Sequence, residues 1–112
     1  MLIHQPGKRR MPLNALTDYI DSKEKEMIEL LEKMVNIDCG TYCKEGVNQV
    51  GDLLADRLST LGFSTERKSQ EEYGDHIIGH KPGSGSYRIL FIGHMDTVFP
   101  QSAAKNRCQG SR

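Results

Sequence analysis

The stretch ILFIGHMDTVFP, residues 89–100, joins an apolar run directly to a histidine and an aspartate. Side chains alternate between the two faces of a strand, so His94 and Asp96 are expected to point to the same side. A histidine can ligate a metal through one ring nitrogen while a carboxylate accepts a hydrogen bond from the other ring N–H, which fixes the tautomer. The same spacing also suits a histidine that is simply satisfied by a neighbouring carboxylate at the start of a loop. The pattern leaves both interpretations open.

The other three histidines supply no second ligand. His76 and His80 are expected at opposite ends of one strand, about 13 Å apart, which is too far for one metal. His4 lies near the start of the chain, in a segment that we expect to be irregular. The chain has three cysteines, an odd count that forms neither a disulfide framework nor a four-ligand zinc cage.

The elements that must position His94 follow from the periodicity of the apolar residues. Helical periodicity covers residues 15–36, and a second helix is expected at 47–61, with Gly62 at the position of a C-cap glycine. Three later segments read as strands: FSTERK, HIIGHK and YRILFIGH, at 63–68, 76–81 and 87–94. The unbroken apolar run Ile89–Ile92 predicts a strand buried on both faces, as at the centre of a sheet. The expected fold class is α/β.

Composition limits the class of protein. A chain of 112 residues is long enough for one small domain. Fifteen basic and fifteen acidic residues give a formal net charge of zero, so no general attraction to nucleic acid or to an anionic membrane is expected. No apolar run reaches the roughly 20 residues that cross a bilayer, and no apolar segment of a secretory signal follows Lys8–Arg10. The expected location is cytoplasmic.

The motif LFIGHMDTVFP resembles the first metal-binding motif of the zinc metallopeptidases that include glutamate carboxypeptidases, aminoacylases and succinyl-diaminopimelate desuccinylase. The resemblance extends back through VNIDCGTY, GVNQVGDLLADRLSTLGF and YGDHIIGHKPGSG, so that it covers about residues 17–100. It is closest to the glutamate carboxypeptidase branch, in which a serine is usual where Cys39 stands.

This resemblance implies that His94 is a zinc ligand and that Asp96, counted among the catalytic residues, orients it. The family fold is a catalytic α/β domain with a smaller inserted dimerisation domain. The chain would be the truncated N-terminal part of such a domain: two helices, then a strand, a strand pair and a buried central strand. The complete family enzyme is a homodimer that hydrolyses a C-terminal glutamate or similar amide in a peptide or N-acyl amino acid. It uses two zinc ions, an aspartate that bridges them, and a glutamate as general base.

The resemblance divides the chain into three parts. Residues 1–14 are expected to be a disordered lead-in, 15–100 a partial metallopeptidase catalytic domain, and 101–112 an irregular tail. No residue after Asp96 is Asp, Glu or His, so the remaining ligands and the general base of the family are missing. The tail departs from the family pattern, as a frameshift, a premature stop or a truncated gene model would cause. We therefore expect a chain that is inactive alone and binds zinc weakly at most.

Two alternatives stay open. The chain could be a non-catalytic or vestigial α/β fragment that binds a partner through an exposed strand edge. It could instead be a small metal-binding module that uses His94, Asp96 and a cysteine. A sheet that ends at its most apolar strand leaves backbone groups unpaired, so we also expect the isolated chain to be marginally stable or prone to aggregation.

Overall fold

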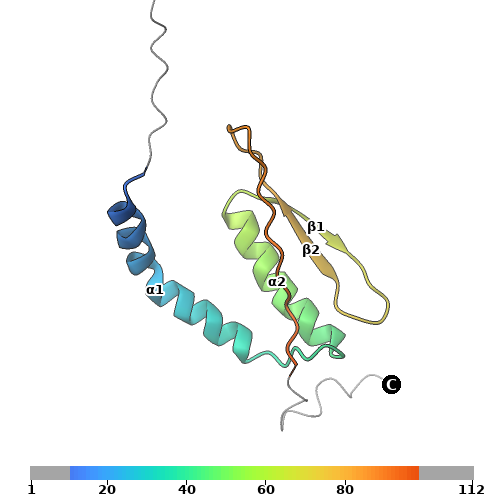
Figure 1. The fold of residues 1–112 in the computed structure, drawn as a ribbon. Helices are drawn as coiled ribbons and strands as arrows, with labels where there is room; N and C mark the ends of the chain where they lie inside the picture. The colour runs from blue at the N-terminus through green and yellow to red at the C-terminus, as the bar shows by residue number, and fades with distance from the viewer. Residues whose placement is uncertain (1–10, 99–112) are drawn as a thin grey trace, which may run out of the picture. The chain divides into compact units, whose positions relative to one another are not determined.

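The computed structural model describes residues 11–98 of the chain, in two compact units divided between Glu32 and Lys33. Its elements are, in chain order, α1 (Leu13–Val35), α2 (Lys44–Thr60), β1 (Ser64–Lys68) and β2 (His76–His80), as Figure 1 shows. Helices followed by strands confirm the expected α/β class. Neither helix of this described part is long and apolar enough to cross a membrane.

Helix α1 begins earlier than the expected helix at residues 15–36. The carbonyl of Pro12 accepts a hydrogen bond from the backbone N–H of Ala15 at 3.0 Å, so residues 13 and 14, which were expected in the lead-in, are helical. Residues 1–10 of the lead-in and the whole expected tail at 101–112 lie outside the described residues. No residue of α1 is buried, and most of its large apolar side chains are exposed; Leu30 and Met34 are half-buried.

Helix α2 is set by backbone geometry at both ends. At its start, a Cβ on Gly46 would overlap the carbonyl oxygen of Asp38, so only a glycine lets the preceding loop pack this closely against the first turn. At its end, Gly62 has φ 84° and donates its N–H to the Ser59 carbonyl at 3.0 Å, while Phe63 donates to the Leu58 carbonyl at 3.0 Å. These two bonds form a Schellman motif, which confirms the expected C-cap glycine.

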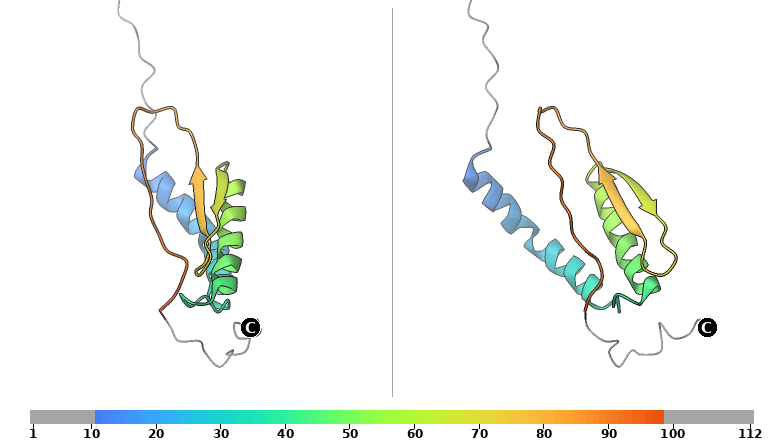
Figure 2. Two further views of the ribbon diagram at one scale, coloured as in Figure 1. Left: turned by 90° about the vertical axis from the view of Figure 1, so that its right-hand side faces the viewer. Right: turned by 45° about the vertical axis from the view of Figure 1, so that its right-hand side comes forward.

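Strands β1 and β2 pair antiparallel, from Ser64 opposite His80 to Lys68 opposite His76. Helix α2 packs against both strands and lies along the hairpin, as Figures 1 and 2 show. The core beside this pair is small: Cys39, Val47 and Val50 form one buried cluster, with Met34, Ile37, Leu54 and Met95 packed partly against it. The loop before α2 and the segment around Met95 therefore share one core with the helix.

The expected buried central strand is not formed in the described part of the chain. Residues 87–94 enter no strand ladder there, and the side chains of Ile89–Ile92 are between 78% and 89% exposed. A strand is buried on both faces only where other strands and helices cover it, and the described sheet consists of β1 and β2 paired with each other. The segment instead runs as an extended trace from the end of β2 back toward the start of α2 (Figures 1 and 2).

A charged cluster around Asp75 holds α2 to the hairpin. Asp75 is 8% exposed, and its Oδ1 accepts hydrogen bonds from Lys44 Nζ at 2.7 Å and from the Gln70 backbone N–H at 3.0 Å. Its Oδ2 lies 3.4 Å from Arg67 Nη1, and its own N–H donates to Asn48 Oδ1 at 2.8 Å. The hydrogen bond from Lys44 is the largest of the causes that lower the pKa of Asp75 from 3.8 to about 2.

We predict that Asp75→Asn lowers the thermal unfolding midpoint at pH 7. Because the pKa of Asp75 is lower in the folded chain, the stabilisation by its carboxylate is present above pH 4 or so and is lost as pH falls toward 2. The difference in unfolding midpoint between variant and wild type should therefore shrink as the pH is lowered from about 4 toward 2. Thermal unfolding followed by circular dichroism measures this difference. Asp52→Asn is the matched control, because Asp52 forms an exposed ion pair with the same Arg67 and should cost little. Equal losses from both variants would contradict the prediction.

Candidate functional site

The segment that carries His94 is attached to the loop before α2. The Thr97 backbone N–H donates to the Cys39 carbonyl at 2.9 Å, and the Thr41 N–H donates to the Thr97 carbonyl at 3.2 Å. These bonds make a parallel bridge between Gly40 and Thr97. Two stretches that lie far apart in the sequence thereby run side by side, and the bridge fixes the directions in which residues 94–97 present their side chains.

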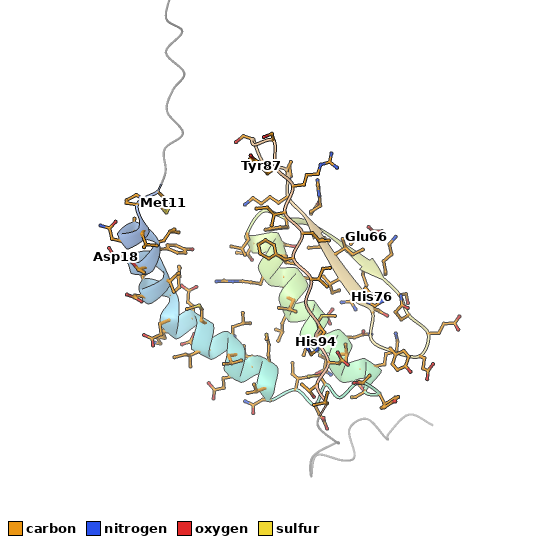
Figure 3. All side chains as sticks on the ribbon, viewed as in Figure 1. Met11, Asp18, Glu66, His76, Tyr87 and His94 are labelled. Carbon is orange, nitrogen blue, oxygen red and sulfur yellow. The ribbon has the colours of Figure 1, made fainter. Side chains whose placement is uncertain are left out.

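The side chain of Met95 points away from the side chains of its two neighbours, His94 and Asp96. Met95 packs against the core of Val47 and Val50, whereas His94, labelled in Figure 3, has a side chain that is 81% exposed. His94 Nδ1 lies 3.2 Å from Asp96 Oδ1, so these two side chains share one side, as the alternation predicts. The same alternation places Met95 on the core side, a role that no sequence motif indicates.

The hydrogen bonds of His94 identify its tautomer. Nδ1 lies 2.9 Å from the backbone carbonyl oxygen of Asp96 and 3.2 Å from its carboxylate. A carbonyl oxygen and an ionised carboxylate have no proton to donate, so both can only accept a hydrogen bond. Nδ1 therefore carries the proton of the neutral ring, and Nε2 keeps its lone pair. Since the His94 side chain is largely exposed, this lone pair is open to a ligand.

Asp96 is held by a residue from the loop before α2. The Thr41 hydroxyl donates to Asp96 Oδ2 at 2.6 Å. This hydrogen bond is the main cause that lowers the pKa of Asp96 from its ordinary 3.8, against the opposing effect of burial. This bond favours the ionised form of the carboxylate and leaves one oxygen on Thr41 and the other facing His94. The sequence motif NIDCGTY contains Thr41, but no local pattern indicates this contact.

A cavity of about 590 Å³ opens beside the His94–Asp96 pair. Val47, Leu54 and Leu58 of α2 line one part of it, and Asp75 and His76 line another. An apolar surface with a few polar groups is typical of small-molecule sites. The cavity therefore combines an apolar wall with the polar side chains of His94 and Asp96.

The described residues do not by themselves assemble a metal centre. Within residues 11–98, no group of three His, Cys, Asp or Glu side chains is arranged to hold a metal ion. A catalytic zinc usually has three protein ligands and an open position, which is more than the His94–Asp96 pair supplies. Cys39 is a buried free thiol and a member of the core cluster. The metal-binding module with a cysteine ligand therefore finds no support among these residues.

Comparison with known proteins gives one informative match. The chain is 36% identical over 88 residues to carboxypeptidase G2 from Pseudomonas sp. (strain RS-16), an alignment that covers 77% of this chain. The chain is similar to part of a carboxypeptidase. It spans about a fifth of that relative, 21% of its length. No protein-family model matches the chain, and no solved structure matches it. This similarity confirms the expected relation to carboxypeptidases.

Proposed function

We propose that this chain carries the first metal-ligand motif of a dizinc metallopeptidase of the glutamate carboxypeptidase branch, with His94 as a zinc ligand. The observation that supports this most directly is the hydrogen bonding of Nδ1 to two acceptors, which leaves the exposed Nε2 with its lone pair. The similarity to carboxypeptidase G2 supports the class of reaction. In the whole protein, that reaction would be hydrolysis of a C-terminal glutamate or a similar amide in a peptide or N-acyl amino acid.

The residues of this chain have separate tasks in that proposal. Asp96 holds the imidazole in the tautomer that can bind a metal and raises the basicity of Nε2. Met95, anchored in the core, keeps His94 on the outer side. Zinc, when bound, polarises an amide carbonyl and lowers the pKa of a bound water. Because the described residues contribute a single ligand to such a centre, the 112-residue chain alone should bind zinc weakly and should not hydrolyse amides.

We predict that zinc added to the isotope-labelled chain shifts the NMR signals of the His94 ring more than those of the other histidines. His94→Ala should abolish the strongest zinc-dependent change, since it removes the open Nε2. The matched control is His80→Ala, which removes an exposed histidine at the end of β2 and should leave the effect at His94 intact. If zinc leaves the His94 signals of the wild-type chain unchanged, the proposed ligand role is wrong.

We also predict that the purified 112-residue chain releases no glutamate from an N-acyl-glutamate in the presence of zinc. Carboxypeptidase G2 is a suitable positive control, because a carboxypeptidase should be active in an assay of this kind. The assay measures free glutamate against time at several zinc concentrations. Zinc-dependent release that disappears in His94→Ala would show that the chain is an active enzyme by itself, contrary to this proposal.

A further inference from the structure

The hydroxyl group of Thr41 has one proton, and the distances show where it goes. Oγ1 lies 2.6 Å from Asp96 Oδ2 and 3.4 Å from the carbonyl oxygen of Thr97. The first distance is that of a strong hydrogen bond between a hydroxyl and a carboxylate, and the second is at the outer limit of a hydrogen bond. Thr41 therefore donates to the carboxylate of Asp96.

The backbone fixes Thr41 independently of that bond. Its N–H donates to the Thr97 carbonyl, and the Thr97 N–H donates to the Cys39 carbonyl, so the bridge holds residues 39–41 on one side and Thr97 on the other. The hydroxyl consequently approaches Asp96 from a rigid position. The side chain of Asp96 is 34% exposed and could otherwise turn toward water.

We propose that Thr41 is a positioning residue, which fixes the Asp96 carboxylate so that its second oxygen faces Nδ1 of His94. This inference rests on the proposed role of His94 as a metal ligand. Without the Thr41 hydroxyl, the neutral backbone carbonyl of Asp96, 2.9 Å from Nδ1, is the acceptor that remains in place. A charged acceptor forms a hydrogen bond about twice as strong as a neutral one, so loss of the carboxylate reduces the basicity of Nε2 and its affinity for a metal.

The first test compares zinc affinity at His94, measured by NMR titration with zinc alone, in the full chain and three variants. Thr41→Val keeps the shape and removes the hydroxyl, and it should weaken binding roughly three- to tenfold, less than the 10–100-fold that is typical of loss of a direct partner of a metal ligand. Thr41→Ser restores the donor and should stay within about twofold of wild type. Thr65→Val is the matched control, because Thr65 is exposed on β1, away from the His94–Asp96 pair, and its hydroxyl makes no hydrogen bond within residues 11–98.

The second test needs no metal. Couplings between the Hα and Hβ protons of Asp96 report its side-chain rotamer in the metal-free chain. Wild type, Thr41→Ser and Thr65→Val should each show one dominant rotamer, and Thr41→Val should show averaging among several. If Thr41→Val does not give a folded circular dichroism spectrum, Thr41→Ala takes its place, because it removes the hydroxyl without adding bulk.

The two tests separate this inference from the proposed function. Failure of zinc to affect His94 in wild type would overturn the metal-ligand role, and the rotamer measurement would still decide whether Thr41 positions Asp96. A single Asp96 rotamer in the folded Thr41→Val or Thr41→Ala chain would overturn the inference, whatever zinc does. Rotamer averaging in Thr41→Ser to the same extent as in Thr41→Val would also overturn it, because the hydroxyl would then be irrelevant.

Discussion

The parallel bridge between Gly40 and Thr97 is the contact on which the candidate site depends. The exposed run Ile89–Ile92 has no ladder partner among the described residues, so no strand pairing before the bridge aligns the segment that follows this run. Two backbone hydrogen bonds at the bridge set the alternation of the side chains, with Met95 toward the core and with His94 and Asp96 away from it. The chemistry of His94 therefore follows from the position of its backbone.

The loop that forms one half of the bridge is itself held by α2. Gly46 allows the Asp38 carbonyl to lie against the first turn of the helix, and Cys39 packs with Val47 and Val50. The buried Asp75 then fastens the same end of the helix to the hairpin through Lys44. A small core and one charged cluster thus support the loop, and the loop in turn supports the site.

Local sequence patterns predicted much of this arrangement. The helices, the Gly62 cap, strands β1 and β2 and the shared side of His94 and Asp96 depend on residues close together in the chain, so periodicity and capping rules detect them. The burial of Ile89–Ile92 was predicted wrongly, because burial depends on which other elements cover a strand. The Thr41–Asp96 hydrogen bond joins residues 55 positions apart, and no spacing rule indicates such a contact.

Amide hydrogen exchange in the full chain, followed by NMR, is the most direct test of the bridge. If the bridge holds His94 in place, the amides of Thr97 and Thr41, which donate to carbonyls, should exchange much more slowly than those of Ile89–Ile92. Exchange of the Thr97 amide at the same rate as those exposed residues would show that the bridge is not formed in solution. The His94–Asp96 pair would then lack the support that this account assigns to it.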